Sequence, residues 1–176
     1  LMGRGAFPDG HELCLEMPGM HGNYTATTSI QKSDLLVAIG VRFDDRVTAN
    51  PSFFAQNAKV IHADIDPAEI GKVREAQVPI VGDAKSVILG LIDALQDLEL
   101  DTKNWINELN SMKTEHPLSY NQDENGPLKV PFVLEELQDL TEEGAIVVSG
   151  VGQHQMWISQ HWNCLLYTSD AADDRR

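Results

Sequence analysis

Apolar residues gather into three short runs in the first part of the chain, at residues 35–41, 59–66 and 78–83. Each run has the length of a strand and contains valine or isoleucine. The first run is continuous rather than alternating, which predicts a strand buried on both faces, as in a parallel sheet. Helical or loop segments separate the three runs, so together they predict an open α/β layer.

Helical spacing marks several of the segments around these strands. Residues 24–33 predict a short helix, and Asp83 is placed to cap a helix that follows the third strand. In Asp66-Pro67-Ala68-Glu69, a capping residue, a proline at the first helical position and a glutamate three residues later predict a helix that begins at Asp66. The helix after Asp83 has one apolar face, formed by Val87, Ile88, Leu91, Ile92 and Leu95.

The α/β pattern stops and then restarts. Residues 98–128 are rich in charged and amide side chains and predict an interdomain connector with one short helix around Trp105. Apolar spacing then predicts a helix from about Val133 to Leu140, and residues 145–152 predict a buried strand that runs into glycines. We therefore expect an α/β protein with one partial domain at 1–97 and the start of a second at 129–163.

The two ends of the chain depart from this pattern. Residues 1–25 are rich in glycine and proline and predict loop, with at most a short helix near 12–16 and a turn in PGMHGN at 18–23. Residues 164–176 have no sustained period, and they resemble the translated read-through of a sequencing adapter. We expect this tail to be non-native and exclude it from the fold.

Charge and cysteine content narrow the classes of function. A formal net charge of −14 disfavours nucleic-acid binding, because the chain repels a phosphate backbone. Any anionic ligand must be held by a local device, such as a helix N-terminus or a placed arginine. Cys14 and Cys164 form neither a metal-ligand spacing nor a disulfide framework, and no apolar run is long enough to span a bilayer.

Candidate chemistry lies at the carboxyl ends of the predicted strands, where open α/β sheets bind ligands. Acidic residues follow all three strands, in Gly40 to Arg46, in Asp64-Ile65-Asp66 and in Gly82-Asp83-Ala84. Asp64 follows Gly40 by roughly 20 residues, the spacing at which an acid commonly binds a ribose hydroxyl. Neither of the usual glycine-rich phosphate motifs is present, so this pattern indicates an adenine-nucleotide site of undetermined type.

Each candidate also has a structural alternative. Asp66 and Asp83 are suited to be helix caps, and the cluster of Arg42, Asp44, Asp45 and Arg46 is typical of a solvated turn. His21 lies between glycines in a loop. His62 alternates within a strand, which favours a packed core residue or a surface residue over a ligand. Gln153 and His154 follow SGVG, a place that suits either an anion site or a plain turn.

The order of these motifs resembles the catalytic subunit of the acetolactate synthases, also called acetohydroxyacid synthases, which are thiamine-diphosphate enzymes of branched-chain amino-acid biosynthesis. The resemblance extends nearly to Asn163, and its most specific parts are GMHG followed by GVRFDDR. The matching pieces are MGRGAFP, PGMHGNYTA, DLLVAIGVRFDDRVT, IHADIDPAEIGK, VPIVGDA and VSGVGQHQMW.

The resemblance implies a partial middle domain that binds FAD, followed by the start of a domain that binds thiamine diphosphate. FAD has a largely structural role in this family. Gln153 and His154 match residues that contact the thiamine diphosphate phosphates, and Asp45 with Arg46 match a pair where the substrate enters. The residues implied to line FAD are Gly19, Met20, His21, Gly40, Val41, Arg42, Phe43, Asp44, Asp64, Ile65, Asp83 and Ala84.

The implied reaction decarboxylates pyruvate on thiamine diphosphate and condenses the product with a second 2-keto acid. The family's activating glutamate and its magnesium-binding stretch match no part of this sequence, so we expect no metal ligand or catalytic residue in this chain and no activity from it alone. The implied partners are small 2-keto acids, further copies in a homo-oligomer and a regulatory small subunit. The implied compartment is the bacterial cytoplasm, with an organelle as the alternative.

Two other functions remain open at this point. One is a sister thiamine-diphosphate enzyme, such as a pyruvate oxidase or a glyoxylate carboligase, and the strings GMHG and RFDDR argue against it. The other is a non-catalytic nucleotide-binding module. The restarted α/β unit from residue 129 argues against a lone module, which has no use for it.

Overall fold

The computed structural model describes residues 3–142 and 145–163, and the backbone of residues 169–171. The chain divides into two compact units. One is formed by residues 27–111, and the other by residues 1–26 together with residues 112–176. The two units are described separately below.

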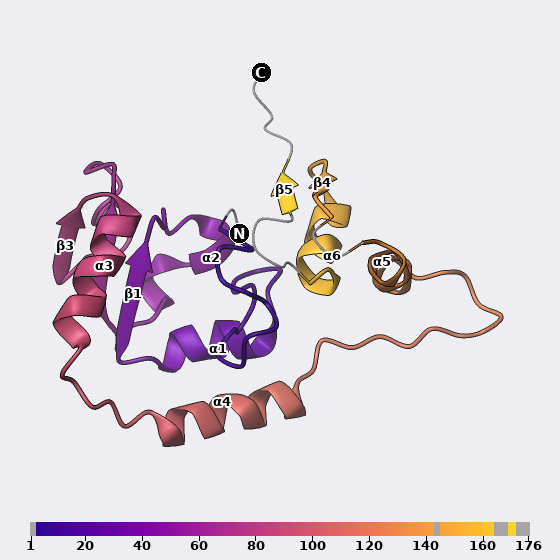
Figure 1. The fold of residues 1–176 in the computed structure, drawn as a ribbon, viewed down its shortest axis with the longest axis horizontal. Coiled ribbons are helices and arrows are strands. Elements are labelled where there is room, and N and C mark those ends of the chain that lie inside the picture. Colours follow the sequence, from indigo (N-terminus) through magenta and orange to yellow (C-terminus); the bar gives the residue numbers. More distant parts are fainter. Residues whose placement is uncertain (1–2, 143–144, 164–168, 172–176) are drawn as a thin grey trace. The chain divides into compact units, whose positions relative to one another are not determined.

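A three-stranded parallel sheet forms the centre of unit 27–111 (Figure 1). Its strands β1 (Leu35–Ile39), β2 (Lys59–Asp64) and β3 (Val78–Val81) lie in that order. Leu35 is opposite Lys59 and Ile61 is opposite Val78. These strands confirm the predicted α/β layer, and each ends two residues before its predicted end.

The prediction that the first strand is buried on both faces is wrong for the part of the chain that the structure describes. Ala38 is buried, but Leu35 and Val37 on the alternate positions are 50% and 44% exposed. Ala38 belongs to the core cluster and Leu36 packs against it, so the strand buries one face only. The pattern of residues 35–41 alone could not distinguish this from burial on both faces.

The helices of this unit begin near the residues that the sequence predicts, except for the helix predicted at Asp66. α1 (Tyr24–Lys32) confirms the expected helix at 24–33, and Asn23 Oδ1 accepts a hydrogen bond of 2.7 Å from the N–H of Ala26 in its first turn. α3 (Ala84–Leu95) contacts β2, and the Asp83 carboxylate caps it by accepting from the N–H of Ser86 at 3.1 Å. α4 (Lys103–Glu115) is longer than the short helix expected around Trp105. The remaining short elements are α2 (Asp45–Thr48) and η1 (Pro51–Phe53).

The predicted helix at Asp66 is wrong. Asp66 Oδ1 does accept from the N–H of Ala68 at 2.9 Å, as a cap would. The next hydrogen bonds, from Glu69 N to Asp66 O and from Lys72 N to Glu69 O, span three residues and form turns rather than a helix. Gly71 then adopts the left-handed conformation with φ of 74°, which ends helical geometry. Asp66 therefore accepts the hydrogen bond of a helix cap, but no helix follows it.

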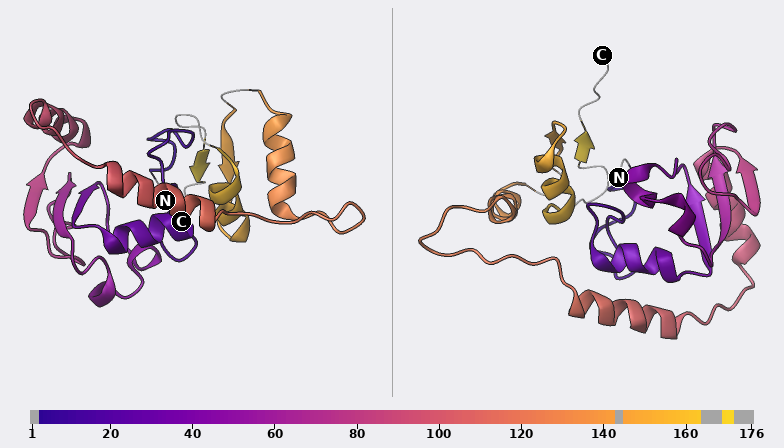
Figure 2. Two further views of the ribbon diagram at one scale, coloured as in Figure 1. Left: turned by 90° about the horizontal axis from the view of Figure 1, so that it is seen from below. Right: turned by 180° about the vertical axis from the view of Figure 1, so that it is seen from behind.

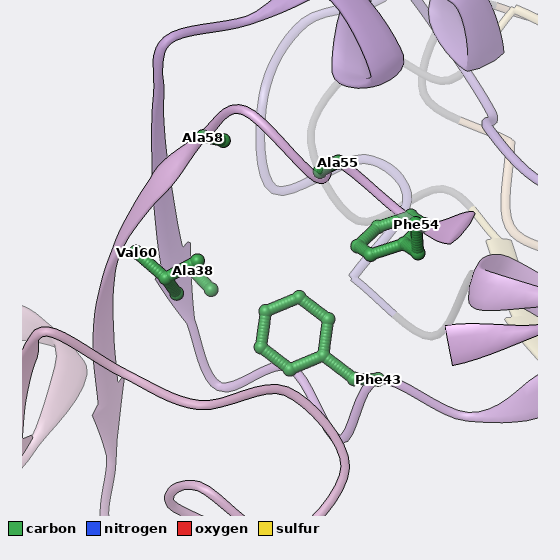
Figure 3. Close-up of a cluster of buried hydrophobic side chains, with 6 residues drawn as sticks. All are labelled: Ala38, Phe43, Phe54, Ala55, Ala58 and Val60. Carbon is green, nitrogen blue, oxygen red and sulfur yellow. The ribbon is translucent and has the colours of Figure 1, made fainter. Parts of the chain in front are cut away.

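The core of this unit is formed by β1, β2 and the segment that joins them (Figure 3). The rings of Phe43 and Phe54 meet edge to face, with centroids 5.9 Å apart. Partly buried residues including Ile30 of α1 pack around the cluster. Phe43 thereby ties the turn after β1 to the core, which positions the residues on either side of it. The cluster consists of Ala38, Phe43, Phe54, Ala55, Ala58 and Val60.

The second unit contains the restarted α/β pattern. Helices α5 (Val130–Asp139) and α6 (Gln153–His161) pack side by side, and they are orange and gold in Figure 2. β4 (Val147–Ser149) is shorter than the predicted strand at 145–152 and pairs in parallel with β5 (Ser169–Ala171). Most of the tail predicted to be non-native, residues 164–168 and 172–176, lies outside the described residues.

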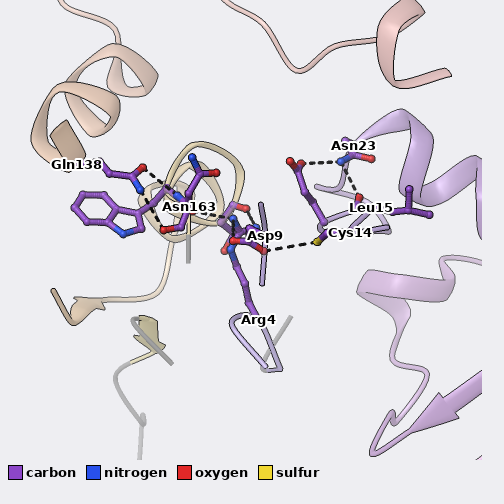
Figure 4. A network of polar contacts seen from close by, with 10 residues as sticks. Arg4, Asp9, Cys14, Leu15, Asn23, Gln138 and Asn163 are labelled. Atoms are coloured by element: carbon purple, nitrogen blue, oxygen red, sulfur yellow. Dashed lines mark hydrogen bonds and ion pairs between the residues drawn. The ribbon is translucent and has the colours of Figure 1, made fainter. Parts of the chain in front are cut away.

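Polar contacts hold the N-terminal segment to α6 within this unit (Figure 4). Arg4 pairs with Asp9 at 2.8 Å, and both side chains are nearly buried. The same guanidinium donates to the backbone carbonyl oxygens of Ser159 and Trp162. Residues 3–23 form turns and bends, which confirms the predicted loop, and Arg4 anchors it to the end of α6.

Candidate functional site

The carboxyl ends of β1, β2 and β3 meet at one edge of the sheet, because the three strands are parallel. Backbone hydrogen bonds join the segments that leave this edge. The N–H of Gly40 donates to Ala63 O at 2.8 Å, and the N–H of Gly82 donates to Asp64 O at 3.0 Å. The three acidic sequence clusters therefore lie side by side, which the strand pattern predicted. We call this region, formed by residues 40–46, 64–66 and 82–84, the carboxyl edge.

The turn after β1 has an unusual backbone. Gly40 has φ of 64° and Phe43 has φ of 53°, so two of four consecutive residues are left-handed. No atom lies within 4 Å of the position that a Cβ on Gly40 would take, so a side chain there is disfavoured by conformation rather than by space. The Phe43 side chain is buried in the core, which leaves its backbone, not its ring, for a ligand at the carboxyl edge.

Asp44 has a structural role in this turn. Its Oδ1 accepts from the N–H groups of Arg46 at 3.1 Å and Val47 at 3.3 Å, and thereby caps α2. Its Oδ2 lies 3.4 Å from Arg42 Nη2. The carboxylate is therefore occupied within the turn, as a cap and in an ion pair, whereas the sequence indicated caps only at Asp66 and Asp83.

The neighbouring charges are free to meet a ligand. The side chains of Arg42, Asp45 and Arg46 are 70%, 76% and 59% exposed. Arg46 Nη1 lies 3.7 Å from Asp45 Oδ2, a long contact between exposed groups that contributes little to stability. The turn therefore presents two guanidinium groups to solvent on a constrained backbone.

The second and third strand ends supply polar and apolar surface. Asp64 Oδ1 accepts from the N–H of Asp66 at 2.9 Å, and its Oδ2 has no partner among the described residues. Ile65 beside it is exposed. Asp83 Oδ1 is occupied by the N–H and hydroxyl of Ser86, while Ala84 begins α3 at the same edge. Asp64 Oδ2 is therefore available for a ligand hydroxyl, and Asp83 Oδ2 likewise has no partner among the described residues.

His62 contacts this edge, a role that the sequence did not indicate. It lies in β2 and is fully buried, so of the two positions expected from the sequence, core or surface, the structure shows the core. Its Nε2 lies 2.9 Å from the Val41 carbonyl oxygen, and its ring meets Phe43 edge to face at 5.0 Å. It therefore contacts the turn that carries the exposed charges. The alternation of the strand is compatible with its burial, but the contact to Val41 depends on the register between strands.

The predicted flavin residues Gly19, Met20 and His21 belong to the other compact unit. Gly19 has φ of 95°, Met20 is exposed, and the His21 carbonyl oxygen accepts from Gln160 Nε2 at 2.8 Å. The following Gly22 is sterically required, because a Cβ there would lie 2.1 Å from Met17 O. The GMHG string therefore encodes a tight turn held by α6.

Gln153 and His154 begin α6 directly after the glycines of the strand end. No side chain caps this helix, and its cap residue Gly152 has φ of 150°. The His154 imidazole lies over the turn, since a Cβ on Gly150 or on Gly152 would approach it to 3.2 Å or 3.1 Å. The first backbone N–H groups of α6 have no side-chain cap, and the glycines before them let a ligand come close to the backbone. Such N–H groups are suited to bind a phosphate group.

A cavity of about 760 Å³ lies within the same unit, between the N-terminal segment, the end of α4, α5 and α6. At its wall Glu135 accepts a hydrogen bond of 2.5 Å from the Tyr120 hydroxyl, which raises the pKa of Tyr120 to about 12. The other Glu135 oxygen lies 3.3 Å from His161 Nδ1. Burial raises the pKa of the Cys14 thiol in the same cavity, so this thiol has little thiolate character.

A metal site and a membrane-spanning helix are both absent from the described residues. No group of three or more histidine, cysteine, aspartate or glutamate side chains is arranged to hold a metal ion there. Among the helices in that part of the chain, none has both the length and the apolar composition needed to cross a membrane.

Comparison with known proteins identifies the family. Residues 1–91 match the model of the thiamine pyrophosphate enzyme central domain. The chain is 52% identical over 164 residues to acetolactate synthase of Mycobacterium leprae, 47% identical over 163 residues to the acetolactate synthase large subunit of Corynebacterium glutamicum, and 44% identical over 167 residues to chloroplastic acetolactate synthase of Arabidopsis thaliana.

These matches cover 91%, 91% and 93% of this chain. The chain spans about a quarter of the length of the curated relatives, 26%, 26% and 25% respectively. They confirm the resemblance stated from the motifs. This chain belongs to the thiamine pyrophosphate enzyme family, with residues 1–91 matching the central domain of these enzymes.

Proposed function

We propose that this chain is part of an acetolactate synthase large subunit, which condenses pyruvate with a second 2-keto acid in branched-chain amino-acid biosynthesis. The observation that carries the proposal is the 52% identity to an acetolactate synthase over 91% of this chain. Residues 1–97 would complete the middle domain, residues 98–128 would connect the domains, and residues 129–163 would begin the domain for thiamine diphosphate.

The carboxyl edge is the part of the chain proposed to bind FAD. Its chemistry fits a dinucleotide, with a close backbone approach at Gly40, a guanidinium at Arg42, a free carboxylate oxygen on Asp64 and exposed apolar surface at Ile65. Asp64 would accept from a ribose hydroxyl, and Arg42 would pair with a phosphate oxygen. The remaining residues proposed to line FAD are Gly19, Met20, His21, Val41, Phe43, Asp44, Asp83 and Ala84.

Arg46 and Asp45 are proposed to form the mouth where the 2-keto acid enters. A guanidinium offers a fork of donors that matches a carboxylate, and Arg46 is exposed on a turn whose backbone is fixed by the Asp44 cap. Asp45 lies within 3.7 Å of that fork and would hold it in orientation before substrate arrives. Its own charge also opposes the approach of anions that Arg46 does not capture.

The N-terminus of α6 fits the diphosphate of thiamine diphosphate. Gln153 and His154 would contact the phosphate oxygens, and the glycines before them allow the backbone to come close. When bound, thiamine diphosphate supplies the decarboxylation of pyruvate and the transfer of the remaining two-carbon unit. Mg²⁺, which accompanies the diphosphate, would be held by residues of the parent enzyme other than those described in this chain.

The same proposal extends to assembly and compartment. The parent enzyme would be a homo-oligomer with a regulatory small subunit, in keeping with the relative named as a large subunit. The bacterial cytoplasm is the proposed compartment because three Mycobacterium relatives are 52% identical to the chain, whereas a chloroplastic relative from Nicotiana tabacum is 45% identical.

The test is a chimeric enzyme. Residues 1–163 replace the segment that they match in the Mycobacterium leprae acetolactate synthase, and acetolactate formation from pyruvate is measured. We expect the chimeric enzyme to form acetolactate, because the graft carries the carboxyl edge and the start of α6 intact. A folded chimeric enzyme that binds thiamine diphosphate but forms no acetolactate would contradict the proposal. The 176-residue chain alone is expected to be inactive.

A further inference from the structure

His62 is completely buried in β2, yet its function is not explained by packing alone. An apolar residue of similar size would fill the same space without the cost of burying a polar ring. The ring instead reaches out of its own strand to the turn that follows β1. There it contacts Val41 through a hydrogen bond and Phe43 through an aromatic contact.

The hydrogen bond fixes the chemical form of the imidazole. The Val41 carbonyl oxygen, 2.9 Å from Nε2, can only accept, so Nε2 must carry a hydrogen. Nδ1 is buried and has no partner among the described residues. A second proton on Nδ1 would place an unpaired charge in this apolar surrounding, so the neutral tautomer with hydrogen on Nε2 is the form that the site accepts.

The turn that His62 contacts needs such support. Its residues Gly40 and Phe43 are left-handed, and a left-handed residue other than glycine persists only where its surroundings impose it. Phe43 is held by Phe54 on one side and by His62 on the other. The hydrogen bond to Val41 then fixes the peptide between these two left-handed residues.

We propose that His62 is a positioning residue for the carboxyl edge: its Nε2–H and ring hold residues 41–44 in the conformation that presents Arg42 and Arg46 to ligands. The inference rests on the proposed function in one respect, that the presented groups meet FAD and a 2-keto acid. The support of the turn by His62 is a property of the chain itself and is tested without either ligand.

Two amide substitutions separate the hydrogen bond from simple packing. In His62→Gln the side-chain amide nitrogen reaches about the position of Nε2 and can still donate to Val41 O. In His62→Asn the same amide is one carbon shorter and lies nearer the position of Nδ1. Both variants bury one amide group, so a difference between them reports the contact to Val41 rather than the polarity of the side chain.

The first readout is the full 176-residue chain in solution. Nitrogen-15 NMR of wild type should show a single neutral His62 tautomer with hydrogen on Nε2. Amide exchange of Arg46, Val47 and Thr48, whose N–H groups bond to Asp44, should accelerate about tenfold in His62→Asn relative to His62→Gln, the change expected from one lost hydrogen bond. Amides of β2 serve as the reference for global unfolding.

Amide exchange at the turn and the position of the hydrogen on the His62 ring both test the proposal. Faster exchange confined to the turn in His62→Asn supports it, and equal exchange at the turn in both variants overturns it. Hydrogen on Nδ1 of the wild-type ring also overturns it, even if a variant fails to fold. Flavin affinity of the chimeric enzyme should then fall about tenfold in His62→Asn and less in His62→Gln. A chimeric enzyme that binds no flavin with His62 intact would count against the proposed function and leave the exchange result standing.

Discussion

The Asp44 carboxylate accepts the backbone N–H of Arg46 at 3.1 Å, so the residue that ends the β1 turn also begins helix α2. Substitution Asp44→Ala should lower the free energy of unfolding by about 1 kcal/mol, the usual cost of a lost N-cap. Asp44→Asn retains an acceptor oxygen and should lower it by less. Urea unfolding of the two variants measures the difference, and equal losses would show that charge, not capping, stabilises this turn.

Gly40 and Gly90 form a matched pair for backbone conformation, because a Cβ on either meets no atom within 4 Å. Gly40 is left-handed with φ of 64°, whereas Gly90 lies inside α3. Gly40→Ala should destabilise the chain by about 1 kcal/mol, and Gly90→Ala should stabilise it by about 0.5–1 kcal/mol. Thermal unfolding reports both signs, and destabilisation by both variants would argue that side-chain space, not φ, governs these positions.

Arg42 and Arg46 are four residues apart and are assigned to different ligands. In the chimeric enzyme, Arg42→Ala should weaken flavin binding about tenfold with little change in the KM for pyruvate. Arg46→Ala should raise that KM by about tenfold or more, because a hydrogen-bonded guanidinium no longer meets the carboxylate. Flavin titration and steady-state kinetics on both variants test the division. Equal loss of flavin in both, with no change in KM, would show that one ligand contacts the whole turn.

Tyr120 and Glu135 predict a pH effect in the second unit. The hydrogen bond to Glu135 raises the pKa of Tyr120 to about 12, above its value of about 10 in the unfolded chain. A raised pKa contributes stability below pH 10, and this contribution is lost as the pH rises from about 10 to about 12. Glu135→Ala removes the acceptor and should return the pKa of Tyr120 toward 10, as seen by titration of tyrosinate absorbance.

Glu136 provides the control for that titration. It lies next to Glu135 on α5 and acts on Tyr120 only through its charge, as the smallest of the causes. Glu136→Ala should therefore lower the pKa of Tyr120 much less than Glu135→Ala, and Tyr120→Phe identifies the absorbance that belongs to this residue. If both glutamate variants lowered the pKa equally, the charge of α5 rather than the hydrogen bond would be the cause.

Local signals in the sequence predicted much of this fold. The apolar runs predicted β1, β2 and β3, and Asp83 predicted the start of α3, because strands and caps depend on residues close together in the chain. The carboxyl edge followed from these, since parallel strands bring their ends together. The same signals failed at Asp66, where the cap formed but Gly71 turned the chain before a helix could propagate.

Features that depend on register lay beyond the sequence. Val41 and His62 are 21 residues apart, and only the pairing of β1 with β2 brings the imidazole to that carbonyl oxygen. The exposure of Leu35 and Val37 likewise depends on which face of β1 packs into the core, and the continuous apolar run does not indicate that face. The sequence shows that Asp44 is an acid at a strand end. Only the geometry of the turn shows that one of its oxygens caps α2 while the other pairs with Arg42.

The central claim is that FAD binds at the carboxyl edge, and hydrogen–deuterium exchange of the chimeric enzyme with and without FAD tests it most directly. FAD should slow amide exchange in peptides that cover residues 40–46, 64–66 and 82–84. Exchange in the exposed segment at 118–128 should not change. If the chimeric enzyme bound FAD and these three segments showed no added protection, the assignment of the carboxyl edge would be contradicted.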